Sequence, residues 1–144
     1  MHLLIGMMLA WEVYGTPDMD GLATWYGIDD GSGVVFRSGE PFRLDAPYCA
    51  VDASMWEEYE GARLLVLSDT GMLVCTVADS GWLYDAGEFR HNGYRWASPV
   101  DFASWDAWVA AGDGQGMVVD IPHDTFVRGF GTDDTQRVQV WRVQ

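Results

Sequence analysis

Short runs of apolar and β-branched residues recur along the chain, and most of them are followed by Gly, Asp or Ser. Runs of this length, closed by turn-forming residues, favour several short strands over long helices. The runs expected to form strands are Leu22–Tyr26, Gly33–Arg37, Tyr48–Val51, Arg63–Ser68, Met72–Ala78, Met117–Val119 and Gln136–Val143. Many short strands with few helices are typical of a small β-barrel.

Turn residues between these runs indicate how neighbouring elements connect. Asp69-Thr70-Gly71 is a hairpin signal, because Gly71 can take the positive φ that such turns use. Residues 63–78 are therefore expected to form a β-hairpin. Three short helices are also expected, each preceded by a residue that favours a helix start and followed by Gly: Met55–Glu60, Pro99–Ala111 and Asp124–Arg128.

The charge balance excludes several classes of partner. The chain has 22 Asp and Glu against 8 Lys and Arg, which gives a formal net charge of −14 at pH 7. A nucleic-acid binder needs clustered basic residues to neutralise phosphates, and an anionic membrane surface attracts polybasic segments. We therefore expect neither a nucleic acid nor an anionic membrane as partner, and a neutral or weakly charged partner remains.

The apolar start of the chain, Met1–Trp11, is too short to span a bilayer. It has no clear signal peptide, because it lacks a basic n-region and a small-residue cleavage site. A first strand or a short helix packed on the core is favoured over a degenerate signal peptide. No membrane insertion is expected.

The chain has two cysteines, Cys49 and Cys75, which form either one bridge in an exported protein or two buried thiols. The histidines are His2, His91 and His123, and none has zinc-ligand spacing to a cysteine. No metal site and no cofactor is expected.

Three sequence blocks, in this order, resemble the double-psi β-barrel domain of expansins and of rare lipoprotein A. They are Gly21–Gly27 (GLATWYG), Val74–Gly81 (VCTVADSG) and Val118–Phe126 (VVDIPHDTF). Tyr48–Asp52 stands where that family has its second strand, and Val138–Val143 resembles the closing strand of bacterial expansins.

This resemblance implies an all-β fold: a six-stranded double-psi β-barrel with short helices and a long aromatic-rich insertion. The barrel domain would cover residues 21–144, with the insertion at 82–116 and an N-terminal extension at 1–20. In the family the second and third blocks are usually separated by a short loop, so the insertion is a departure. It would either substitute for a separate carbohydrate-binding domain or cover the groove.

The resemblance also implies a catalytic site. It assigns Asp120 as the acid, Asp79 as its partner carboxylate, and Thr24 and Tyr26 as groove residues. Cleavage of a glycosidic bond needs one carboxylic acid that is protonated at the leaving oxygen. A second carboxylate nearby raises the pKa of that acid, since two like charges resist joint ionisation.

Both aspartates also have a structural interpretation: Asp79 as a turn residue and Asp120 as the cap of the helix that follows. An inverting hydrolase would need a further carboxylate across the sugar, and Asp29 and Asp30 are the candidates unless they are plain turn residues. Asp52 stands where the lipoprotein family often has His, which argues against full transglycosylase activity.

The insertion carries many aromatic residues. Trp82, Tyr84 and Trp96 lie in Gly-rich sequence and are candidates for a sugar-binding platform, because flat ring faces suit the C–H faces of pyranoses. Phe102 and Trp105 have helical spacing, which favours a small core of their own.

The expected function is binding of peptidoglycan or another wall glycan, by either a lytic transglycosylase or an expansin-like loosening protein. The expected location is extracellular or in the cell envelope. The alternative is a non-catalytic structural or attachment module in a surface or viral tail assembly, virion-associated and holding a protein partner through the insertion. The net charge favours glycans of low charge.

Overall fold

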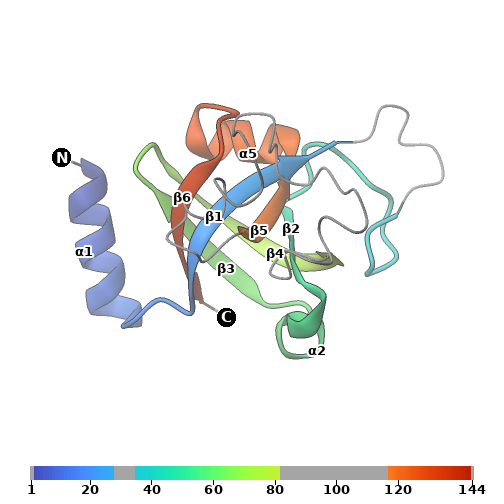
Figure 1. Ribbon diagram of the computed structural model, residues 1–144, viewed down its shortest axis with the longest axis horizontal. Coiled ribbons are helices and arrows are strands. Elements are labelled where there is room, and N and C mark those ends of the chain that lie inside the picture. Colours follow the sequence, from blue (N-terminus) through green and yellow to red (C-terminus); the bar gives the residue numbers. More distant parts are fainter. Residues whose placement is uncertain (1, 28–34, 82–116, 144) are drawn as a thin grey trace.

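The computed structural model describes residues 2–27, 35–81 and 117–143, in which six strands close into one barrel (Figure 1). Around the barrel the strands follow the order β1, β5, β2, β4, β3, β6 and return to β1. This mostly β architecture confirms the barrel that the strand-like runs predict. The strands are β1 (Met19–Tyr26), β2 (Tyr48–Asp52), β3 (Arg63–Ser68), β4 (Met72–Gly81), β5 (Met117–Pro122) and β6 (Gln136–Arg142).

The sheet is mixed, and its two halves have the same topology. β1 pairs in parallel with β5, and β2 in parallel with β4, whereas the other four pairings are antiparallel. Exchanging β1, β2 and β3 for β4, β5 and β6 reproduces the order around the ring and the direction of every pairing. A short helix follows the second strand of each half.

The short helices close the barrel at opposite ends (Figure 1). A 3-10 turn, η1 (Ala53–Met55), leads from β2 into α2 (Trp56–Tyr59), and α5 (His123–Phe130) follows β5 directly. Each helix is followed by a glycine in the left-handed region, Gly61 with φ of 75° and Gly131 with φ of 73°. These two helices confirm the sequence prediction for both segments.

The N-terminal helix, α1 (His2–Tyr14), lies beside the barrel and not in it (Figure 1). Its Ala10 is buried against Leu65 and Leu67 of β3 and Trp141 of β6. A short helix packed on the core is therefore what the apolar start of the chain forms. No helix in the described part of the chain is both long and apolar enough to cross a membrane.

Every strand contributes apolar side chains to the inside of the barrel, and α5 adds Phe126 and Phe130 at one end. Side chains alternate between the two faces of a strand. Because Ala23, Val51 and Ile121 belong to this core, the residues next to them in the sequence, Thr24, Ala50 and Asp120, lie on the outer face of the barrel. This alternation decides which residues are available to a ligand.

The β3–β4 hairpin is confirmed, but the reason for its glycine differs from the predicted one. Ser68 and Gly71 close the turn with a backbone hydrogen bond of 2.9 Å. Gly71 does not have positive φ. It is required because a Cβ at this position would lie 2.2 Å from the carbonyl oxygen of Gly129 in α5.

The predicted strand at Gly33–Arg37 is wrong in its described part. Val35 forms only an isolated bridge with Pro41, and the chain then turns at Gly39, where φ is 99°. The expected insertion 82–116, with its helix Pro99–Ala111, lies outside the described residues, as do Asp29 and Asp30.

The two cysteines form a disulfide between β2 and β4, with their Cα atoms 5.8 Å apart. Both are buried. This resolves the two alternatives left by the sequence in favour of the bridge, and it joins the two strands that pair in parallel.

We expect the unfolded, unreduced protein to give no reaction with a thiol reagent. Because the bridge closes a loop with a sequence separation of 26, the Cys49→Ala/Cys75→Ala variant should lose about 3–4 kcal/mol of unfolding free energy. Urea denaturation measures this loss. Two reactive thiols in the unreduced wild type would contradict the assignment.

Gly71→Ala should destabilise the protein by about 1–3 kcal/mol, since the new methyl group meets the backbone of α5. The matched control is Gly6→Ala in α1, where an added Cβ meets nothing within 4 Å. This control should be neutral or gain up to about 1 kcal/mol from helix propensity. Equal urea midpoints for Gly71→Ala and wild type would show that the close approach to α5 is absent in solution.

Candidate functional site

Four residues from four adjacent strands form one row across the outer face of the barrel. Thr24 of β1 is paired with Asp120 of β5, Asp120 with Ala50 of β2, and Ala50 with Asp79 of β4. Residues directly opposite each other project to the same face of a sheet. The fold therefore brings together Thr24, Asp79 and Asp120, which three separate sequence blocks contribute. These three residues and Ala50 are called the acid row below.

An irregularity in each parallel ladder precedes this row. The β1–β5 register shifts between Leu22 and Ala23, and the β2–β4 register shifts between Cys49 and Ala50. Such shifts bend a strand and change where the following side chains project, and they are common next to functional sites. The row therefore lies just after a register shift in each of the two parallel pairs.

Asp120 is fully buried although it lies on the outer face. The Thr24 hydroxyl donates a hydrogen bond of 3.0 Å to its Oδ1. Its Oδ2 is buried with no hydrogen-bond partner among the described residues. Burial raises the pKa of Asp120 well above its ordinary value, the Thr24 hydroxyl and the Ile121 N–H lower it, and the charge of Asp79 adds to the rise.

Asp79 is better solvated and has more hydrogen-bond donors. The Tyr26 hydroxyl donates to its Oδ2 at 3.2 Å, and the backbone N–H of Arg37 donates to its Oδ1 at 3.1 Å. Burial raises the pKa of Asp79, while these donors, the Ser80 N–H and the Arg37 charge oppose the rise. Asp79 therefore ionises more readily than Asp120, and the two acids are suited to different roles.

Residues 35–47, called the strap below, hold one side of the site. At one end, the Ser38 N–H donates to the carbonyl of Ala78 in β4 at 3.0 Å. At the other end, the carbonyl of Leu44 accepts from the N–H groups of Asp124 and Thr125 at the start of α5, at 2.9 and 3.2 Å. The strap therefore connects β4 to α5.

The strap is anchored by an aromatic cluster. Phe36 packs against Phe42 and Tyr48 with ring centroids 5.2 and 5.1 Å apart, and Phe42 packs against Tyr26 at 5.4 Å. Tyr26 thus touches both the strap and Asp79. Its position supports a structural role in the site in addition to the predicted contact with a ligand.

The structure changes the expected cause of the raised pKa of Asp120. The resemblance implied a second carboxylate as the cause, whereas burial is the larger cause and the charge of Asp79 the smaller one. Because Ala50 separates the two acids, their Cα atoms are about two strand spacings, or ~10 Å, apart. The carboxyl groups flank Ala50 and do not share a proton.

The structural interpretations of the two acids are wrong. Asp79 lies within β4 and not in a turn. The cap position of α5 is Pro122, and no side chain makes a capping hydrogen bond there. Asp52 does have such a role, because its carboxylate accepts from the Ser54 N–H at 3.0 Å and caps η1.

His123 is partly exposed at the start of α5. Its Nδ1 lies 2.9 Å from Asp124 Oδ1, and its ring meets the edge of Trp25 with centroids 4.4 Å apart. The platform candidates Trp82, Tyr84 and Trp96 lie outside the described residues. The sequence missed Arg37, because nothing in its local pattern indicates contact with β4.

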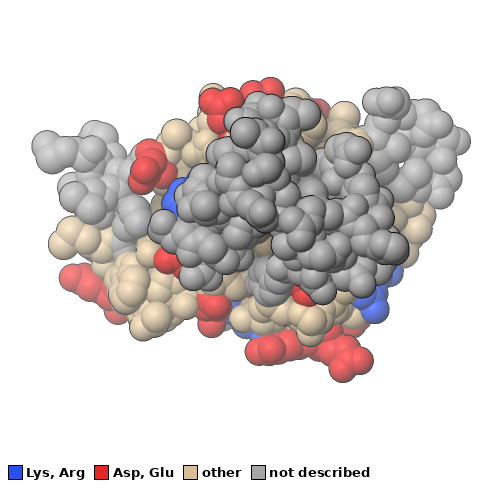
Figure 2. Space-filling model, viewed as in Figure 1, with Lys and Arg blue, Asp and Glu red and all other residues tan. Residues whose placement is uncertain are grey.

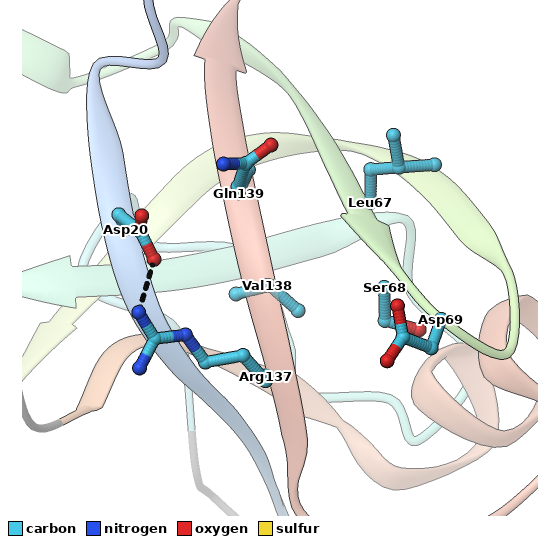
Figure 3. A pocket seen from close by; sticks show the side chains of 7 residues that line it. All are labelled: Asp20, Leu67, Ser68, Asp69, Arg137, Val138 and Gln139. Atoms are coloured by element: carbon cyan, nitrogen blue, oxygen red, sulfur yellow. Dashed lines mark hydrogen bonds and ion pairs between the residues drawn. The ribbon is translucent and has the colours of Figure 1, made fainter. Parts of the chain in front are cut away.

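A separate surface pocket of about 140 Å³ lies on the opposite side of the ring, on β6 and its neighbours β1 and β3 (Figure 3). An ion pair of 2.8 Å between Arg137 and Asp20 lies along one side of it. This pocket is therefore not part of the acid row. The residues that line it are Asp20, Leu67, Ser68, Asp69, Arg137, Val138 and Gln139.

Within residues 2–27, 35–81 and 117–143, no three His, Cys, Asp or Glu side chains are grouped so that they could hold a metal ion. Comparison of the sequence with protein-family models gives no match, and neither does comparison with curated proteins.

The raised pKa of Asp120 should make the protein less stable as pH rises. The native state keeps this proton to a higher pH than the unfolded chain does, so stability falls as pH increases from the unfolded pKa, near 4, to the native pKa. Asp120→Asn cannot ionise and keeps an oxygen for Thr24. Between the unfolded and the native pKa of Asp120, the unfolding free energy of this variant relative to wild type should therefore rise by about 1.4 kcal/mol per pH unit.

Urea denaturation at a series of pH values between 4 and 8 measures this difference. Asp45→Asn is the control, because Asp45 is an exposed carboxylate on the strap. A constant difference between Asp120→Asn and wild type at all pH values would show that Asp120 has the same pKa in both states.

Proposed function

We propose that this protein is a double-psi β-barrel that binds a cell-wall-type glycan and acts on it with Asp120 as the acid. The observation that carries the proposal is a buried, hydrogen-bonded carboxyl group that retains one oxygen without a partner among the described residues, together with a second carboxylate on the far side of β2. A glycosidic oxygen is the kind of acceptor that such an acid protonates.

The barrel topology supports the double-psi assignment. It has two equivalent halves, and each contributes one strand to both parallel pairs, β1 with β5 and β2 with β4. The three sequence blocks that resemble expansins and rare lipoprotein A fall on β1, β4 and the β5–α5 junction. These are the elements that contribute the three polar residues of the row.

A single protonated carboxyl group is sufficient for intramolecular transglycosylation, because this reaction needs no second carboxylate to activate water. Asp120 gives its proton to the glycosidic oxygen as the bond from that oxygen to the anomeric carbon breaks. The 6-hydroxyl of the same muramic residue then bonds to the anomeric carbon, and its proton returns to Asp120. Atoms and charges balance with no water consumed.

In this scheme the neighbours of Asp120 have separate roles. Thr24 holds Oδ1 by its hydroxyl, so the proton belongs on Oδ2. Asp79 ionises more readily than Asp120, and its carboxylate stabilises the positive charge that develops at the anomeric carbon. An expansin-like protein would use the same surface to disrupt glycan packing without cleavage.

We place the protein outside the cell or in the cell envelope. The Cys49–Cys75 disulfide supports this location, since such bridges persist in oxidising compartments. The proposed partner is a polysaccharide, and the net charge of −14 argues against a nucleic acid.

One observation favours a second candidate, the structural or attachment module with a protein partner, in a surface assembly or a virion. Asp120 is 0% exposed, and a polymer reaches only an acid that it can touch. In that case the acid row would have no catalytic function, and residues 82–116 would hold the partner.

Purified protein should release anhydro-muropeptides from peptidoglycan. Asp120→Asn should lower this activity by at least ~10²-fold, since the general acid is removed. Product analysis by mass spectrometry measures it. Asp45→Asn, with the same change of charge on the strap, should retain full activity.

The three candidates give different results in this assay. Binding to an insoluble glycan without any product would support the expansin-like function. Neither product nor binding on any glycan, together with a stable stoichiometric protein partner, would support the attachment module and overturn the glycan proposal.

A further inference from the structure

Arg37 is an exposed residue of the strap whose side chain is fixed beside the acid row. Its guanidinium lies over the ring of Trp56 in α2, 4.7 Å from the ring centroid. Its Nη1 donates a hydrogen bond of 2.8 Å to the hydroxyl of Ser80 in β4. An exposed Arg is normally free to move, whereas these two contacts, from different elements, hold this one in a single orientation.

The contacts leave most of the donors of this guanidinium available. A guanidinium carries five N–H groups in a planar fork. Trp56 covers one face of the plane, and among the described residues Ser80 is the hydrogen-bond acceptor for one N–H. The edge of the fork therefore retains the paired N–H groups that bind a carboxylate through two parallel hydrogen bonds.

The position of Arg37 connects it to the acids. Its backbone N–H donates to Asp79 Oδ1, and its side chain reaches Ser80, the next residue along β4. The charge of Arg37 also lowers the pKa of Asp79. The fixed cation therefore lies close to Asp79, where β4 and α2 hold it.

We propose that Arg37 determines substrate specificity by binding a carboxylate on the glycan, so that the substrate class is a carboxylated and not a neutral polysaccharide. This inference rests on the proposed function. It replaces the preference for glycans of low charge that the net charge alone favours.

The overall negative charge is compatible with this preference. Acidic side chains lie at several separate places around the described part of the face in Figure 2, and not in one patch. Salt at physiological concentration screens exposed charges beyond about 8 Å, whereas a bidentate guanidinium–carboxylate pair acts at contact. One well-placed Arg can therefore select an anionic group in an acidic protein.

The experiment measures binding to pairs of polymers that share a backbone and differ in charge. One pair is carboxymethyl-cellulose and hydroxyethyl-cellulose. The other is intact peptidoglycan and the same peptidoglycan with its carboxylates converted to methylamides. Dissociation constants are measured for wild type, Arg37→Gln, Arg37→Lys and Arg43→Gln.

We expect wild type to prefer the carboxylated member of at least one pair. Arg37→Gln should weaken binding to that member by about 10- to 100-fold and leave binding to the neutral member unchanged. Arg37→Lys keeps the charge but loses the fork, so it should recover only part of the affinity. Both substitutions keep the backbone N–H of residue 37, which donates a hydrogen bond to Asp79.

Arg43→Gln is the matched control, because Arg43 is an exposed strap residue and its loss changes the net charge equally. An equal effect of Arg37→Gln and Arg43→Gln would show that only the overall charge matters, which overturns the inference. Equal wild-type binding to both members of each pair also overturns it and leaves glycan binding intact. Binding to no polymer overturns the proposed function itself.

Discussion

The candidate site depends on the position of Ala50, whose backbone pairs with Asp120 on one side and with Asp79 on the other. In a closed barrel every strand has two neighbours, so β2 fixes the distance between the two acids without contributing a functional group of its own. The side chain of Ala50 is a buried methyl group, which neither donates nor accepts a hydrogen bond. The backbone of β2 therefore acts as a spacer between two carboxyl groups.

The two acids differ because their surroundings differ. Asp120 is buried with a single side-chain donor, Thr24, whereas Asp79 has donors from Tyr26, from the strap and from its own strand. Burial disfavours a carboxylate, and each donor restores part of its stability. The strap is thus more than a connection, because without its backbone N–H Asp79 would resemble Asp120 more closely.

Local sequence patterns predicted the parts of this arrangement that depend on local structure. The apolar and β-branched runs located the six strands of the barrel, and the resemblance selected Thr24, Asp79 and Asp120 as site residues. What the patterns could not predict depends on contacts between distant segments. Gly71 is required by α5, Arg37 acquires its role from Trp56 and Ser80, and the predicted strand that contains Arg37 does not form.

The two equivalent halves show how a site arises in a repeated topology. Exchanging the halves places Ala50 on Asp120 and Thr24 on Asp79, since these residues occupy corresponding positions in the pairing. Gly61 and Gly131 then also correspond, at the same distance along the chain from Ala50 and Asp120. The backbone is therefore nearly two-fold while the row is not. One half supplies a buried acid where the other supplies a buried methyl group, and it is this difference that gives the row a proton donor at one position and none at the next.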